Sequence, residues 1–265
     1  MSAAYETTIF ELRRGYQANL ARTGVALLAI GICLAHAGLF DAERLIEGGP
    51  ALLGLLGEMT PPDFSNLVSW GKPLIDTLAM SVAGTFLAVL LSVPLGFLAA
   101  SNSSPHPLVQ RLARGILNIL RSVPELVMGI VFVAAVGFGA LPGVLALGLH
   151  SVGMVGKFFA EAVEHCDKRA VEAVRATGAT PMQVILHGIL PQVLPLMADI
   201  TIYRWEYNFR ASTVMGMVGA GGIGFELMAS LRIMQYQEVS AILLLILLMV
   251  TLVDAQGSWL RRKFA

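Results

Sequence analysis

The stretch "VEAVRATGATPMQVILHGILP" (residues 171–191) begins with polar residues, although the chain as a whole has a mean hydropathy of +0.72. Its residues predict two short helices joined by a corner. Gly178 suits the left-handed position that ends a helix, and Thr180 can cap the helix that follows. Pro181 then falls at the first helical position and Gln183 at the third, which completes a Thr-x-x-Gln capping box. We expect a rigid helical elbow between two long apolar segments.

The composition indicates that this elbow belongs to a membrane protein. Hydrophobic residues make up 56% of the 265 residues and charged residues only 14%, so the chain has more apolar surface than a soluble fold could bury. The formal net charge is zero, which suggests neither nucleic acid nor an acidic partner. Cys33 and Cys166 lie far apart, and the five histidines lack metal-ligand spacing. The sequence therefore indicates neither a disulfide framework nor a metal site.

Six spans are expected along the chain, because a spanning helix needs about 20 apolar residues. The segment 24–40 is a first span or the h-region of a secretory signal, and we favour the span. Residues 41–72, which contain Gly48-Gly49-Pro50 and Pro61-Pro62, are expected to hold a short interfacial helix. The other spans are predicted at 77–100, at 126–137 with a gradual approach from 111, at about 142–164, at 190–209 and at 239–253.

The positions of lysine and arginine predict the orientation, because cytoplasmic loops carry the excess of these residues. If six helices cross, 13 such residues fall on the side of the elbow, including Arg13 and Arg14. The other side holds only Arg44, Lys72 and Arg232. The elbow and both termini are therefore expected in the cytoplasm.

The elbow resembles the "EAA" motif of ATP-binding-cassette (ABC) importer permeases, which reads Glu-Ala-Ala, three residues, Gly, nine residues and Ile-x-Leu-Pro. The sequence departs from this motif at Val174, which replaces the third small residue, and at Gly188, which replaces the usual isoleucine. Local sequence alone is equally compatible with an ordinary cytoplasmic loop. The resemblance implies that the elbow docks in a cleft of an ATPase subunit. The residues implied in this coupling are Glu172, Ala173, Arg175, Gly178, Ala179, Pro181, Leu190 and Pro191.

Four further segments are similar to the permease subunits of phosphonate importers and their phosphite-type relatives. They are "RSVPELV" (121–127), "GVLALGLHSVGMVGKFFAEAVE" (143–164), "ILPQVLP" (189–195) and "YRWEYNFRASTVMGMVGAGGIG" (203–224). The resemblance implies an all-α, multi-pass protein of the bacterial inner membrane. Its type I ABC importer permease core of five helices would cover 73–265, with the coupling elbow at 165–190 and one extra helix within 1–72. The substrate, a phosphonate or a related oxyanion such as phosphite or hypophosphite, rests on this resemblance alone.

The same resemblance implies the partners of the chain. They are a second copy that completes a homodimer, two ABC ATPase subunits and a periplasmic substrate-binding protein. The sequence contains no G-x-x-x-x-G-K-[ST] phosphate-binding loop, so ATP and magnesium are expected to bind the ATPase partner. The permease itself is expected to do no chemistry.

Other functions remain as alternatives. The chain could serve an ABC importer for another small solute. An ion-coupled secondary transporter would show inverted repeats, and an intramembrane enzyme would need clustered catalytic or metal-binding side chains. The sequence shows no repeat and no such cluster.

Charged residues inside the predicted fifth span are candidates for the transport pathway, because intramembrane charges are costly and usually face a partner or a water-filled cavity. Glu206 and Arg210 are spaced i,i+4 with the glutamate first, which predicts a local ion pair. Arg204 has no such local partner, so it is the first candidate to attract an anionic substrate. Glu125 is a weaker candidate.

A glycine-rich segment follows the fifth span, and its Gly219, Gly221, Gly222 and Gly224 match the pattern G-x-G-x-x-G. A dinucleotide site also needs a preceding strand within a βαβ unit, which this sequence does not predict. We therefore expect flexible or closely packed backbone instead. The permease resemblance places these glycines near the extracytoplasmic end of the pathway.

Overall fold

A computed structural model describes the backbone of residues 2–264 and the side chains of residues 15–17 and 19–263. The chain divides into two compact units, Met1–Glu58 and Met59–Ala265. The first unit contains α1 (Ser2–His36), whose apolar part Gly15–His36 is long enough to cross a membrane. Arg13 and Arg14, which contribute to the expected cytoplasmic excess, lie outside the described side chains.

The second helix of this unit, α2 (Ala42–Glu58), is a single amphipathic helix of 17 residues. It is not among the described helices that are long and apolar enough to cross a membrane, as expected for an interfacial helix. It begins before Gly48-Gly49-Pro50 and runs through these residues, with Pro50 inside the helix. Proline removes one helical hydrogen bond and does not always end a helix. The helix therefore extends on the N-terminal side of Pro50, beyond the segment between Pro50 and Pro61.

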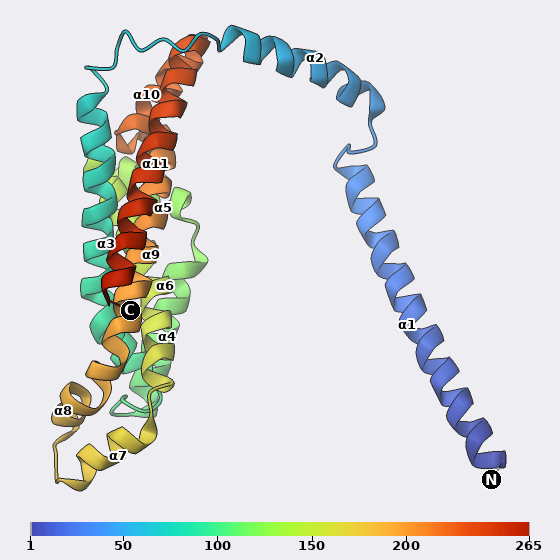
Figure 1. Cartoon of the computed structure of the whole chain (residues 1–265), viewed down its shortest axis with the longest axis vertical. Helices are drawn as coiled ribbons and strands as arrows, with labels where there is room; N and C mark the ends of the chain where they lie inside the picture. The colour runs from blue at the N-terminus through green and yellow to red at the C-terminus, as the bar shows by residue number, and fades with distance from the viewer. Residues whose placement is uncertain (1, 265) are drawn as a thin grey trace. The chain divides into compact units, whose positions relative to one another are not determined.

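The second unit is a bundle built on four long helices, α3 (Gly71–Ala99), α6 (Ala140–Glu164), α9 (Leu190–Met215) and α11 (Tyr236–Phe264). Figure 1 shows that the axes of these four helices are roughly aligned with one another. The described residues form no strand. Small residues allow α3 and α6 to approach closely, because a side chain at Gly96 of α3 would overlap Phe159 of α6.

The remaining candidate span is bent. α4 (Pro107–Ser122) and α5 (Glu125–Val136) together are apolar and long enough to cross, but their axes differ by 86°. Val123 between them is extended, as is usual for a residue that precedes a proline. By length and composition the described residues contain five candidate spans, or six if this bent pair counts as one. The expected number of six is reached only with the bent pair.

The observed helix ends agree with the predicted breaks. α5 ends before Gly137 and α6 begins at Ala140, within the predicted break. At the other end of α6, two short helices form the elbow, α7 (Lys168–Ala176) and α8 (Pro181–Val184). They project from one end of the bundle, whereas α10 (Ile223–Arg232) lies at the opposite end (Figure 1). The sequence did not predict α10, because the glycines before it hid the start of a helix.

Candidate functional site

The elbow has the corner that the sequence predicted. Gly178 follows α7 with a φ of +82°, a left-handed conformation that glycine adopts without strain. A side chain there would meet no other atom, so the backbone angle alone accounts for the glycine. The capping box is also confirmed: the Thr180 side chain accepts from the Gln183 N–H, and the Thr180 N–H donates to Gln183 Oε1 over 2.8 Å.

The elbow is anchored on one face and open on the other. Val171 of α7 and Val184 of α8 are buried in the same apolar cluster as Phe159 of α6. The opposite face exposes Glu172 and Ala173. Among the residues implied in coupling, Arg175, Gly178, Pro181 and Pro191 are also exposed, whereas Ala179 and Leu190 are half-buried. Six of the eight implied coupling residues are therefore exposed.

The sequence did not single out two apolar residues that share the exposed face of the elbow. Met182 is 65% exposed and Leu186 is 46% exposed. Their signal in the sequence was weak, because methionine and leucine are common throughout this chain.

The two positions that depart from the "EAA" motif contact each other. A side chain at Gly188 would have its Cβ 3.6 Å from Val174 Cβ and 3.5 Å from Val171 Cα. The larger residue on α7 thus faces the smaller residue on η1 (Ile185–Ile189), a π-helical turn between α8 and α9. Tight interiors tolerate substitutions that conserve the total volume. The extra volume at Val174 therefore partly fills the space that Gly188 leaves, and the spacing of the motif is intact.

Gln192 ties the two ends of the elbow together. Its amide nitrogen donates to Gly188 O over 2.5 Å, and its amide oxygen accepts from the Asp167 N–H over 2.9 Å. Asp167 is the N-cap of α7, and Gly188 lies just before α9. One side chain therefore links the entry and the exit of the elbow. This role could not be predicted from the sequence, because it depends on residues 25 positions apart meeting in space.

A second site lies within the bundle, around Arg204 of α9. This residue is only 5% exposed. Its Nε donates to Ser151 Oγ of α6 over 2.8 Å, and its guanidinium lies over the Tyr207 ring at 4.2 Å. Arg204 is therefore not the isolated cation that the sequence suggested, since a cluster of polar side chains surrounds it.

Glu125, at the start of α5, completes this cluster. Its Oε1 accepts from the Tyr207 hydroxyl over 3.0 Å. Its Oε2 lies 3.9 Å from the terminal nitrogen of Arg204 and equally far from His150 Nε2. Neither Oε2 nor this nitrogen has a hydrogen-bond partner among the described residues. Arg204 and Glu125, two pathway candidates of opposite charge, thus lie side by side. They are close enough for electrostatic attraction but beyond hydrogen-bonding distance.

The cluster continues across the bundle to α3. Ser151 Oγ donates to Asn208 Oδ1 over 3.0 Å, and Asn208 Nδ2 donates to Thr85 Oγ1 over 2.9 Å. These side chains are buried. These three residues were not predicted from the sequence. Charged residues inside a span are a strong signal of function, whereas uncharged polar residues such as serine, threonine and asparagine are a weaker one.

The predicted ion pair between Glu206 and Arg210 is wrong. Glu206 Oε1 lies 2.8 Å from Arg261 NH1 on α11, and the Glu206 side chain is 6% exposed. Arg210 is exposed and makes no ion pair with a described residue. The i,i+4 spacing predicted the correct geometry for a pair, but it could not show that α11 brings a closer cation. Neither residue belongs to the cluster around Arg204.

The glycine-rich segment is closely packed. A side chain at Gly222 would have its Cβ 2.5 Å from Thr77 Oγ1 of α3, and its φ of +72° also favours glycine. The Thr77 hydroxyl accepts from the Ile223 N–H over 2.9 Å. Side chains at Gly219 and Gly224 would also overlap their neighbours, whereas Gly221 has more room. This packing confirms the expected close approach of backbone, without the strand that a dinucleotide site requires.

The fold is that of a multi-pass helical membrane subunit with a short helical projection at one end of its bundle. The chain belongs to the family of binding-protein-dependent transport system inner membrane components, whose model matches residues 92–265. It is thus a multi-pass permease of the inner membrane, of the ABC importer type. This agrees with the resemblance stated from the "EAA" motif.

Two individual relatives are permeases of phosphite and phosphate transport systems. The chain is 66% identical over 250 residues to the phosphite transport system permease protein PtxC of Stutzerimonas stutzeri, covering 94% of this chain and 91% of that protein. It is 43% identical over 223 residues to the phosphate-import permease protein PhnE of Mycolicibacterium smegmatis, covering 84% of this chain but 42% of that protein. Both relatives are permease subunits, consistent with a transport subunit that is not an enzyme.

A solved structure shows the same fold. An inward-facing conformation of the MetNI methionine ABC transporter contains a chain that superposes with a TM-score of 0.65 at 23% identity. The match covers 74% of this chain and 96% of that chain. The core therefore has the fold of a type I ABC importer permease.

Proposed function

We propose that this permease imports a phosphorus oxyanion, with phosphite and phosphonates as the principal candidates. The support for this substrate class is the 66% identity to a phosphite permease across almost the whole chain. Buried Arg204, with one terminal nitrogen that no described residue binds, is chemically suited to attract such an anion. Hypophosphite and phosphate belong to the same chemical class.

We also propose that the elbow is the coupling element. The single observation that carries this proposal is the capped corner, anchored by Val171 and Val184, that holds Glu172 outward on a rigid projection. Two ABC ATPase subunits would bind the elbows of two permease copies and would carry ATP and magnesium. A periplasmic substrate-binding protein would deliver the anion. We infer a homodimer, because a five-helix core is too small to enclose a gated path alone.

In this arrangement the elbow and both termini face the cytoplasm. The 13 cations expected on this side would then lie in α1, α4 and α7, in the last turn of α11 and, for Lys157, in the last turns of α6. The glycine-rich segment and α10 would lie at the extracytoplasmic end, where close packing of backbone can form a gate. The permease would alternate between a conformation open to the cytoplasm and one open to the outside, and it would perform no reaction itself.

The test is the complete transporter, made from this permease with its ATPase and binding-protein partners in a membrane. Uptake of radiolabelled phosphite is measured with unlabelled hypophosphite, methylphosphonate, phosphate and sulfate as competitors. Competition by a phosphorus oxyanion and not by sulfate supports the proposed substrate class. Absence of phosphite uptake, or uptake that excess unlabelled phosphite does not reduce, contradicts it. Co-purification of the ATPase with wild type and with Glu172→Ala tests the elbow separately.

A further inference from the structure

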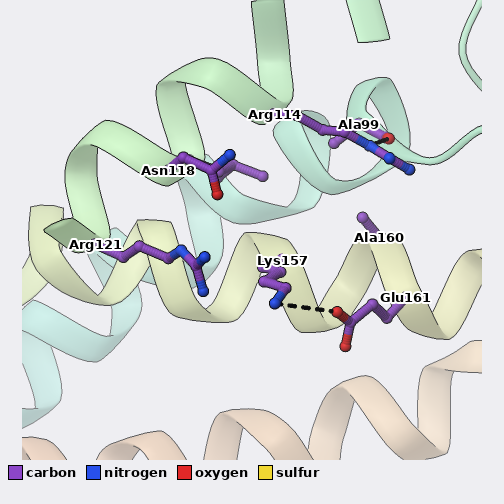
Figure 2. A pocket seen from close by; sticks show the side chains of 8 residues that line it. Ala99, Arg114, Asn118, Arg121, Lys157, Ala160 and Glu161 are labelled. Atoms are coloured by element: carbon purple, nitrogen blue, oxygen red, sulfur yellow. Dashed lines mark hydrogen bonds and ion pairs between the residues drawn. The ribbon is translucent and has the colours of Figure 1, made fainter. Parts of the chain in front are cut away.

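A basic cavity lies between α4 and α6 (Figure 2), and α4 lies toward the end of the bundle that carries the elbow (Figure 1). Its volume is about 240 Å³, well above the roughly 10–15 Å³ that a single water needs on this kind of measure. Its lining includes Arg114, Asn118 and Arg121 from α4 and Lys157 and Glu161 from α6. The cavity is separate from the cluster around Arg204 and from the exposed face of the elbow, because its lining residues belong to neither.

Close contact between the two helices brings the cations together. A side chain at Gly153 of α6 would have its Cβ 2.6 Å from the Arg121 backbone nitrogen, so only glycine allows α4 to cross at this point. Lys157 lies four residues after Gly153 and shares its helical face. On α4, Arg114, Asn118 and Arg121 are spaced at four and three residues and also share a face. Both polar faces therefore line one space.

The three cationic side chains that line this cavity differ in the partners that they already have. Arg114 is held by Ala99 O at 2.8 Å and by Glu164 Oε1 at 2.5 Å. Lys157 Nζ lies 3.5 Å from Glu161 Oε1. Arg121 makes no side-chain hydrogen bond or ion pair with a described residue. Glu164 pairs with Arg114 and Glu161 with Lys157, whereas Arg121 is exposed to solvent and has no carboxylate partner among the described residues.

We propose that this cavity binds a tetrahedral phosphorus oxyanion, with Arg121 and Lys157 as the principal ligands and the Asn118 amide as an additional donor. A planar guanidinium can donate two parallel hydrogen bonds to such an anion, and an ammonium group adds a second charge. The volume accommodates the anion with some of its water. The same chemistry is offered by a free oxyanion and by the phosphate of a lipid head group.

This binding site goes beyond the transport proposed above. Its position on the cytoplasmic side rests on the proposed topology, but anion binding itself does not. The site is therefore tested by binding to the purified permease, a measurement that does not need transport. A failure here would leave the proposed uptake of phosphite untouched, and a failure of uptake would leave this site untouched.

The experiment uses the full chain purified in two forms. For the free anion, the permease in nanodiscs of zwitterionic lipid is titrated with radiolabelled inorganic phosphate and phosphite. For the lipid, native mass spectrometry measures phosphatidylglycerol and cardiolipin retained by the detergent-purified protein. The test variant is Arg121→Gln combined with Lys157→Gln. The matched control is Arg111→Gln, which removes an exposed cation from the same helix but does not line the cavity.

Wild type and Arg111→Gln should bind one of these probes equally, and the test variant should bind it about tenfold to hundredfold more weakly, as expected for lost charge-assisted hydrogen bonds. Asn118→Asp, which adds a carboxylate to the cavity, should weaken binding without removing a cation. Binding of the soluble anions identifies a free oxyanion site, and loss of retained lipid identifies a head-group site. Equal binding of all probes by wild type and the test variant, or no binding by wild type, overturns the proposal.

Discussion

Glu206 on α9 and Arg261 on α11 form an ion pair 2.8 Å long, and it links two helices that are far apart in the sequence. Gly257, one turn before Arg261, provides the space for the glutamate, since any side chain there would overlap the Glu206 carboxylate. The Arg261 side chain is 30% exposed and the Glu206 side chain 6%. The pair therefore joins a buried carboxylate to a partly solvated cation.

Arg261→Met should destabilise the permease, because it leaves the Glu206 carboxylate buried without a cation. Breaking a fully buried pair costs about 3–5 kcal/mol, and the partial exposure of Arg261 lowers our expectation to about 1–3 kcal/mol. The measurement is the melting temperature of the purified protein in detergent. Arg210→Met is the control and should have little effect. An equal loss for both variants would mean that the pair does not hold α9 to α11.

The contact between Val174 and Gly188 predicts a compensating pair of substitutions. Gly188→Ile alone should overpack the elbow and cost about 1–3 kcal/mol. Val174→Ala combined with Gly188→Ile restores both residues of the "EAA" motif and should recover most of this loss. Stability and ATPase co-purification are measured for the single variants and the double variant as a double-mutant cycle. Additive effects would show that the two positions do not compensate.

Gln192→Leu should loosen the elbow, because it removes the link between Asp167 and Gly188. Loss of two hydrogen bonds is expected to cost about 1–3 kcal/mol locally. Hydrogen exchange of residues 167–190 should become faster while the four long helices stay protected. Gln183→Leu, which removes only the cap of α8, is the comparison and should affect α8 alone. Unchanged exchange at the start of α7 in Gln192→Leu would contradict the link.

Arg204→Met should lower uptake of the anion by at least about tenfold in assembled transporters, with basal ATPase activity retained. Arg204→Lys should restore part of the uptake, because the charge returns without the planar fork. Arg204→Met also leaves Glu125 without its nearby cation, so Arg204→Met with Glu125→Gln is made in parallel. If this double variant assembles and transports like wild type, Arg204 is a structural residue and not part of the pathway.

The proposed topology predicts which side of the membrane labels an introduced cysteine. A cysteine at Gln183 should react only from the cytoplasm, and one at Pro61 only from outside. Exposed Cys33 is first replaced by serine. Burial raises the pKa of the Cys166 thiol above its usual range, so near pH 7 this native cysteine should react slowly, and more readily as the pH rises. If each introduced cysteine is labelled only from the other side of the membrane, the true topology is the reverse of the proposed one.

The sequence alone determined the features that depend on neighbours along the chain. The capping box of Thr180 and Gln183 and the left-handed Gly178 follow from local backbone preferences, so the elbow could be predicted closely. Apolar length predicted the long spans, because a bilayer demands a minimum number of apolar residues. The break near Gly137 was visible for the same local reason.

Only the tertiary structure decided which distant side chains meet. The partner of Glu206 is Arg261 and not Arg210, and Glu125 lies beside Arg204 although 79 positions separate them in the sequence. The contact of Val174 with Gly188 and the two hydrogen bonds of Gln192 are likewise products of packing. Helical periodicity fixes the face on which a residue lies, but the neighbouring helix depends on how the whole bundle buries its surface.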